Sequence, residues 1–295
     1  MMVSRWHDTP QVLRPRDKNM ARWLSEPSQA LTGETKKLQE QYEAKYPSLV
    51  AIRDIPHLQL DISEAIDMDS VLRELAPVLG EPGYQPFIIT EEPRRINDLW
   101  TAKALINLSP DHVDEFWRPN WLELAATEHA EWQPRAAEIM QTRKLRANDM
   151  QFYKTQLWDR LPTISSYISR NISDDFYRVH IGRLSPHGFL TFHNHRKPKS
   201  DDGFPYGEII VHLALITDQR CTMYVRDQQD DDKVYGQHYA AGQTWLFNSW
   251  LDHAADCTQL DYHRVHLTMW CRIEDDKFRD LLERSLIKHA SHVNV

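Results

Sequence analysis

The sequence predicts an α+β domain in which a small barrel or sandwich of short antiparallel strands is braced by helices on one side. Helical patterns dominate up to about Asp175, and beyond it the hydrophobic period shifts toward two. Helices that precede a run of short strands are typical of α+β domains. The chain has 295 residues, of which 41% are hydrophobic and 10% aromatic, so it can bury a sizeable core.

Residues 1–49 are expected to be an N-terminal arm or helical extension, and residues 50–295 the main domain. Residues 1–30 are polar and contain Arg and Pro. Residues 34–46 predict a short charged helix whose apolar stripe recurs at four-residue spacing.

Helical support for the strands is expected over residues 50–175 and again over residues 274–291. The elements expected there are a strand over His57–Ile62, a helix over Asp69–Leu75 that Pro77 and Gly80 end, helices within 110–148, a helix that begins at Pro162, and a terminal amphipathic helix.

The strand core is expected over about residues 177–272, because short alternating runs follow one another there with turn residues between them. The predicted strands are Tyr177–Leu184, Phe189–His195, Glu208–Ile216, Cys221–Arg226, Gln243–Phe247 and Arg264–Cys271.

Composition excludes several classes of function. The formal net charge is -8 and the longest basic run is Arg196–Lys199, so no nucleic-acid partner is expected. No stretch approaches 18 apolar residues and no apolar leader is present, which predicts a cytoplasmic protein without a membrane partner. Three widely spaced cysteines indicate neither a disulfide framework nor a CxxC metal site, and a reducing compartment is expected. The sequence leaves the oligomeric state open.

Three histidines are candidate metal ligands. His193 and His195 lie two residues apart on a predicted strand, so both should face the same side. His253 follows the strand Gln243–Phe247, in a predicted loop with Asp252, where it could meet the first pair and hold a divalent transition metal. The alternative is a polar strand end and a surface histidine.

Arg264 and His266 alternate on the last predicted strand and should face inward together, opposite Val265 and Leu267. A buried arginine is costly unless it meets an anion, which can be a bound carboxylate or an acidic side chain of the protein. His212, on an earlier strand, should also face inward. Both His212 and His266 could instead be core histidines with satisfied hydrogen bonds.

Taken together, these segments resemble the aspartyl/asparaginyl β-hydroxylase family of Fe(II)/2-oxoglutarate-dependent oxygenases, which includes proline hydroxylases. The family pattern is Leu-x-Pro-Gly-Gly-x4-His-x-Asp, then Arg-x-His-x-x-Leu, then Gly-Glu-x-Trp-x-Phe with a histidine eleven residues after the glycine, then Arg-Val-His-Leu. The matching segments, in the same order, are Leu184–His195, Ile210–Leu215, Gly242–His253 and Arg264–Leu267.

The resemblance implies a double-stranded β-helix, a jelly-roll or cupin-like fold, that binds Fe(II), 2-oxoglutarate and O2. It makes His193 and His253 iron ligands, with residue 195 at the third ligand position, and Arg264 the clamp on the distal carboxylate of 2-oxoglutarate. His212 and His266 would lie near this cosubstrate. The implied reaction hydroxylates an unactivated C–H bond of an amino acid or an amino-acid-like or peptidyl substrate.

Two positions depart from the family pattern. His195 stands where an acidic ligand is expected, and Ile210 stands where an arginine is usual. His195 could ligate the metal, or it could leave two histidines and water, or a nearby carboxylate could replace it. The candidate carboxylates are Asp201, Asp202 and Asp252. The charged loop 196–207 is a candidate lid.

Two other functions compete with the oxygenase. One is a cupin-type dioxygenase that uses three histidines and no 2-oxoglutarate, although the eleven-residue interval from Gly242 to His253 is long for its second motif and Arg264 would have no role. The other is a non-catalytic β-helix protein that binds a small molecule or peptide.

Overall fold

The computed structural model describes residues 33–53, 55–81, 85–88, 96–107, 152–193, 208–227, 233–249, 251–257 and 259–293. The expectations for residues 1–30, for helices within 110–148 and for the loop 196–207 lie outside these ranges, as do His195, Asp201 and Asp202.

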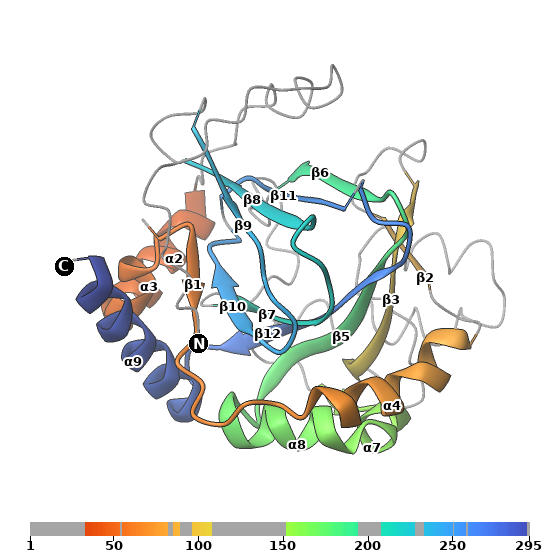
Figure 1. Ribbon diagram of the computed structural model, residues 1–295. Helices are drawn as coiled ribbons and strands as arrows, with labels where there is room; N and C mark the ends of the chain where they lie inside the picture. The colour runs from red at the N-terminus through yellow and green to blue at the C-terminus, as the bar shows by residue number, and fades with distance from the viewer. Residues whose placement is uncertain are drawn as a thin grey trace, which may run out of the picture.

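Two antiparallel sheets form the centre of the molecule (Figure 1). The large sheet has the order β1-β10-β7-β12-β5-β3-β2, with β4 paired to β3, and the small sheet has the order β6-β11-β8-β9. The strands of the large sheet are β1 His57–Gln59, β2 Gln85–Ile88, β3 Ile96–Asn107, β4 Tyr153–Lys154, β5 Phe176–Leu184, β7 Glu208–Ile216, β10 Thr244–Phe247 and β12 Arg264–Arg272. Those of the small sheet are β6 Phe189–His193, β8 Thr222–Arg226, β9 Val234–Gln237 and β11 His253–Asp256.

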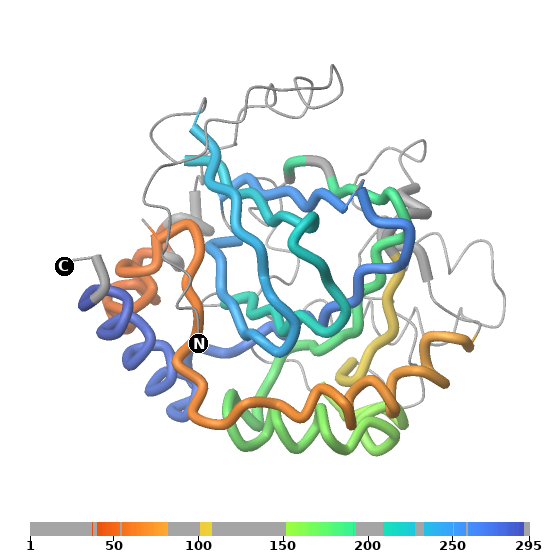
Figure 2. Tube along the Cα trace, viewed as in Figure 1, coloured from red at the N-terminus to blue at the C-terminus, as the bar shows by residue number. Residues whose placement is uncertain are grey.

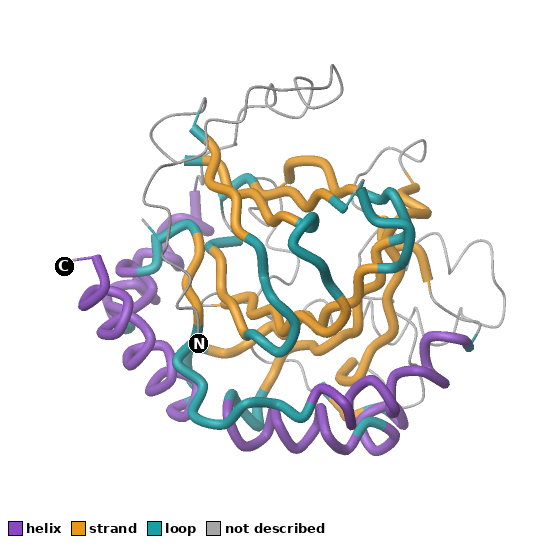
Figure 3. Tube along the Cα trace, viewed as in Figure 1, coloured by secondary structure: helices purple, strands orange, loops and turns teal. Residues whose placement is uncertain are grey.

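From β5 onward the chain passes back and forth between the sheets. β5, β7, β10 and β12 belong to the large sheet, whereas β6, β8, β9 and β11 belong to the small one. Figure 3 shows the two layers of strands with the helices gathered along one side. The predicted α+β class, antiparallel strands braced by helices, is therefore confirmed.

The helices pack on the outer face of the large sheet (Figure 1). They are α2 Gly33–Lys45, α3 Pro47–Ala51, α4 Met68–Gly80, α7 Gln156–Arg160, α8 Pro162–Asn171 and α9 Asp276–Val293. One apolar cluster joins them to the strands: it includes Leu75 of α4, Ile168 of α8, Phe278 of α9, and Val265 and Leu267 of β12. None of the helices in the described ranges is long and apolar enough to cross a membrane.

Helix α4 begins as the sequence predicts but ends later. The Asp67 carboxylate accepts the backbone N–H groups of Asp69 and Ser70 and so caps the first turn. Pro77 lies inside the helix, which continues to Gly80, so the expectation that Pro77 contributes to ending it is wrong. Proline so close to the C-terminus removes a single backbone hydrogen bond, and the burial of Val78 supports the last turn.

Segment 50–175 also contributes strands that the helical expectation did not include. β3 pairs along most of its length with β5 and extends the large sheet. Its residues Ala102, Ala104, Leu105 and Ile106 are all buried, so no polar alternation marks the strand in the sequence.

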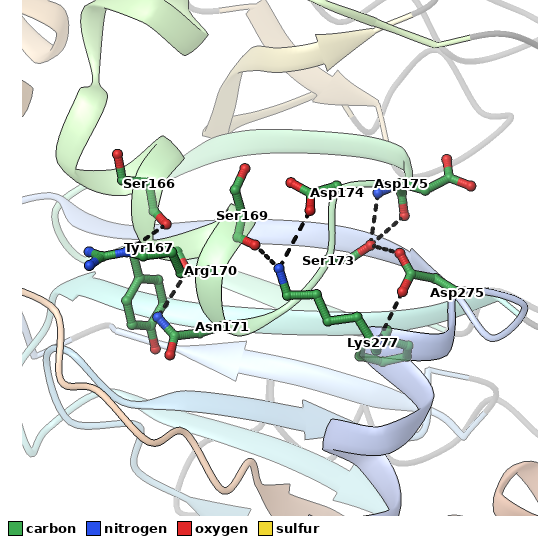
Figure 4. A network of polar contacts seen from close by, with 11 residues as sticks. Ser166, Tyr167, Ser169, Arg170, Asn171, Ser173, Asp174, Asp175, Asp275 and Lys277 are labelled. Carbon is green, nitrogen blue, oxygen red and sulfur yellow. Dashed lines mark hydrogen bonds and ion pairs between the residues drawn. The ribbon is translucent and has the colours of Figure 1, made fainter.

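The two ends of the described chain lie side by side, as the red and blue segments of Figure 2 show. The Ser285 hydroxyl of α9 accepts the Asp61 N–H at 2.9 Å, and Lys288 forms an ion pair with the Asp61 carboxylate. A second polar network joins the end of α8 to the start of α9 (Figure 4). In it Lys277 donates to the Ser169 carbonyl, and the Ser173 hydroxyl accepts the Asp175 N–H at 2.9 Å.

Candidate active site

The candidate residues come from the inner faces of the two sheets. On β12, Val265 and Leu267 join the core beneath the helices, whereas His266 faces His212 of β7, with ring centroids 5.1 Å apart. The predicted alternation of this strand is confirmed. Phe247 of β10 stacks on His212 at 4.9 Å and lies 4.6 Å from the ring of His253. These contacts form one continuous wall from β12 to the start of β11.

His253 begins strand β11 and does not lie in a loop, which corrects the sequence expectation. The strand has only four residues, and two of them are Ala254 and Ala255, a residue type with low strand propensity, so the sequence does not predict a strand here. In the ladder His253 pairs with His193 at the end of β6 and with Val225 of β8. The backbone thus brings together two of the predicted ligand positions, which are 60 residues apart in the sequence.

The ring of His253 is fixed by a local hydrogen bond. Its Nδ1 lies 2.9 Å from the Leu251 carbonyl oxygen, so Nδ1 carries the proton and donates it. In the neutral ring the lone pair is then on Nε2, which is the usual arrangement of a metal-binding histidine.

Asp252 lies on the other face of the small sheet, away from His253. It pairs with Arg226, whose backbone N–H donates to the Asp252 carbonyl at 2.8 Å and whose Nη1 lies 3.4 Å from the carboxylate. Arg226 also lies over the ring of Phe192, which packs with Tyr224 and Ala254. Because neighbouring residues of a strand point to opposite faces, Asp252 does not join the candidate ligands.

Arg264 is buried at the start of β12 and has no acidic partner among the described residues. Its Nη1 lies 3.6 Å from the Met223 sulfur, and its Nε has no hydrogen-bond partner in that part of the chain. The structural salt bridge that the sequence left open is therefore not seen within the described ranges. A charge buried in this way stabilises any anion that can reach it.

The histidines beside Arg264 are uncharged. Burial, with the nearby charge of Arg264, lowers the pKa of His212 to about 3, and the same two causes hold the pKa of His266 well below its ordinary value. The Nδ1 of His212 lies 3.4 Å from the Thr268 hydroxyl, while its Nε2 has no partner in the described residues. These rings can therefore donate or accept hydrogen bonds without adding charge to the wall.

Two further groups of this wall were missed by the sequence analysis. His180 of β5 lies 4.8 Å from the ring of Trp270 and close enough to His266 to influence its pKa. Tyr239 stacks on Trp245 and is hydrogen bonded to the Nδ1 of His57 at 2.8 Å. The alternation of β5 could have indicated His180, whereas nothing in the sequence signals the position of Tyr239.

Within the described ranges, no group of three or more His, Cys, Asp or Glu side chains is arranged to hold a metal ion. Position 195, the third ligand position of the family pattern, lies outside those ranges.

No protein-family model and no curated protein matches the sequence. Among solved structures, the chain is similar to an oxidoreductase of the 2OG-Fe(II) oxygenase family from Burkholderia pseudomallei, with 13% identity, a TM-score of 0.40, and coverage of 83% of this chain and 94% of that one. It is also similar to a Pseudomonas putida prolyl-4-hydroxylase, with 15% identity, a TM-score of 0.38, and coverage of 76% and 98%.

A third similar structure is a cupin domain from Bordetella pertussis, with 13% identity, a TM-score of 0.23, and coverage of 32% of this chain and 78% of that one. None of these three is described as an aspartyl/asparaginyl β-hydroxylase. All three TM-scores lie below 0.5, so these similarities assign no function to this chain.

Proposed function

We propose that this chain is an Fe(II)/2-oxoglutarate-dependent dioxygenase with a double-stranded β-helix fold. We further propose that it hydroxylates an unactivated C–H bond of an amino acid or an amino-acid-like or peptidyl substrate. The observation that carries the proposal is the pairing of His193 with His253, combined with a buried Arg264 that lacks an acidic partner in the described part of the chain.

The strand order supports the fold. In a double-stranded β-helix, eight strands divide equally between two facing sheets, and here β5, β7, β10 and β12 lie in one sheet and β6, β8, β9 and β11 in the other. The first and last of these strands, β5 and β12, pair in the large sheet. Positions 193 and 253 then lie where a strand of the small sheet ends and another begins, at one mouth of the barrel.

Positions 193 and 253 fit two ligands of one metal ion. Residues directly opposite in an antiparallel ladder share a face of the sheet. The hydrogen bond from Nδ1 of His253 to Leu251 places the lone pair of the neutral ring on Nε2. In this proposal His195 stands at the third position, as the family resemblance implies. Bound Fe(II) would supply the activation of O2 and the oxidation of the C–H bond.

Arg264 fits the distal carboxylate of 2-oxoglutarate. The guanidinium can bind a carboxylate with two hydrogen bonds, and its burial strengthens that attraction. The neutral His212 and His266 beside it offer hydrogen bonds without competing for the anion. This buried cation favours the proposed function over the three-histidine dioxygenase, which has no need of it.

The proposal is tested by anaerobic calorimetry of Fe(II) and 2-oxoglutarate binding. We expect one Fe(II) per chain and 2-oxoglutarate binding that requires Arg264. Arg264→Lys keeps the charge but loses the planar fork, so the affinity should fall by at least about tenfold. Arg226→Lys is the matched control, because Arg226 is equally buried but points to the opposite face and contacts Asp252.

Two outcomes would contradict the proposal. The first is 2-oxoglutarate affinity that is unchanged in Arg264→Lys, and the second is Fe(II) affinity that is unchanged in His253→Ala. If both bind as expected, conversion of 2-oxoglutarate to succinate is then screened against free amino acids and short peptides. Binding without turnover of any of them would favour the non-catalytic alternative.

A further inference from the structure

Two of the three cysteines meet at the end of the small sheet. Strands β8 and β11 pair from Val225 with His253 down to Thr222 with Asp256. One step further along the same register brings Cys221 opposite Cys257, and the two thiols lie close enough to shift each other's pKa. The residues lie 36 positions apart in the sequence, so their spacing gave no sign of this contact.

The backbone places this pair in a geometry that suits a covalent bond. Arg226 donates its N–H to the carbonyl of its partner Asp252, which marks that pair as hydrogen bonded. Pairs alternate along an antiparallel ladder, so Cys221 and Cys257 occupy a non-hydrogen-bonded position. Accordingly, their N–H groups turn elsewhere, to the Asp218 and Gly188 carbonyls. Cα atoms at such a position are about 4.5 Å apart, within the disulfide range of about 4.4–6.8 Å.

We propose that Cys221 and Cys257 are a redox modification site that forms a reversible disulfide across strands β8 and β11. The bond would join β8 to β11 on the inner face of the small sheet, two residues from Met223, which contacts Arg264. Formation of the bond needs an oxidant of the peroxide class and no metal.

The local electrostatics make Cys221 the attacking thiol. A hydrogen bond from the Cys257 thiol and the nearby charge of Arg264 lower the pKa of Cys221 to about 7, whereas burial alone would raise it. The pKa of Cys257, the donor in this hydrogen bond, is raised. Cys221 also follows Arg220, whose side chain is 41% exposed, so the start of strand β8 lies close to solvent.

Hydrogen peroxide can serve as the two-electron oxidant that this disulfide requires. The Cys221 thiolate attacks one oxygen of hydrogen peroxide, the O–O bond breaks, and a sulfenic acid forms while hydroxide leaves as water after protonation. The Cys257 sulfur then attacks the sulfenic sulfur, so that the S–S bond forms, the S–O bond breaks and a second water leaves. Two thiols are oxidised by two electrons in total, and one peroxide is reduced.

The test uses the full chain, reduced, freed of metal with a chelator and then treated with one equivalent of hydrogen peroxide. Remaining thiols are alkylated in denaturant, and the peptides are mapped by mass spectrometry. We expect two of the three thiols to be lost, with the Cys221 and Cys257 peptides joined and two hydrogens lighter, and dithiothreitol to restore both. The oxidised chain should melt roughly 5–10 °C above the reduced chain, because the bond closes a long loop.

Cys271→Ser is the matched control and should form the same disulfide, because Cys271 is equally buried but packs under the helices on β12. Cys221→Ser and Cys257→Ser should each form none within the chain. Three results would overturn the proposal: three thiols that all remain alkylatable, a Cys221 sulfinic acid beside an alkylatable Cys257, or a melting temperature that oxidation lowers.

Discussion

Replacement of Arg264 by methionine should stabilise the protein while it abolishes cosubstrate binding. The guanidinium is buried, its Nη1 faces the Met223 sulfur at 3.6 Å, and its Nε has no partner among the described residues. The neighbouring His212 and His266 are neutral, and Cys221, whose pKa is about 7, is mostly uncharged when unfolding is measured below that pH. Methionine has a similar length and volume and no charge, so the desolvation cost of the cation disappears. We expect the free energy of unfolding to rise by about 1–3 kcal/mol.

Arg226→Met gives the opposite sign from a comparable position. Arg226 is 2% exposed, and its Nη1 lies 3.4 Å from the Asp252 carboxylate, which is itself 6% exposed. Its removal takes a buried cation away from the Asp252 carboxylate, and breaking a buried pair in this way costs about 3–5 kcal/mol. The two variants thus remove the same group, Arg264 from between the two sheets and Arg226 from the outer face of the small sheet.

Urea unfolding of the wild type and both variants, with and without 2-oxoglutarate and Fe(II), measures the effect. At a cosubstrate concentration of about 100 times its dissociation constant, the wild type should gain about 2.7 kcal/mol, and Arg264→Met should gain nothing. The reasoning is refuted if Arg264→Met loses about 3–5 kcal/mol as Arg226→Met does. That result would mean that Arg264 has a structural anionic partner within the protein.

Three further predictions follow from single residues. His193→Ala should abolish Fe(II) binding in calorimetry, His195→Ala should weaken it less, and His195→Asp should preserve or improve it; equal losses in the two alanine variants would contradict the assigned order. Burial lowers the pKa of His57 to about 4. The stability that the neutral ring contributes is therefore fully present above about pH 6.5 and is lost as the pH falls through 4, by about 3 kcal/mol in total. In urea titrations His57→Gln should flatten that slope, and an unchanged slope would exclude this residue as its origin. Asp67→Ala should cost about 1 kcal/mol through loss of the α4 cap, whereas Asp69→Ala, two residues further along in the first turn, should cost much less.

The strands that the sequence predicts well are those that have a strict division of faces. β12 places Val265 and Leu267 under the helices and His266 between the sheets, so a period of two is visible in the sequence. β7 has the same length as predicted, Glu208–Ile216. In contrast, β3 is buried around Ala104 on both faces and β11 has four residues, so neither carries an alternating signal.

The candidate site was only partly accessible to sequence reasoning, because ladder register is a long-range property. The sequence shows that His193 and His253 are candidates, but only the pairing of β6 with β11 places them opposite each other. The same register separates Asp252 from His253, although the two are adjacent in the chain. It also places Cys221 opposite Cys257, a contact that their spacing in the sequence does not indicate.

Arg264 shows why burial and partners must be known together before a charged residue is assigned a role. From the sequence, an inward arginine in an acidic protein is explained equally well by an internal ion pair and by a bound anion. Folding removes Arg264 from water in either case, and this desolvation cost is offset only by a nearby negative charge. Within the described ranges its neighbours include a thioether, two neutral imidazoles, the Tyr239 phenol and the Cys221 thiol, whose pKa of about 7 its charge helps to lower. A dicarboxylate bound beside Arg264 would supply the missing charge, so the desolvation cost that folding does not offset would be recovered on binding.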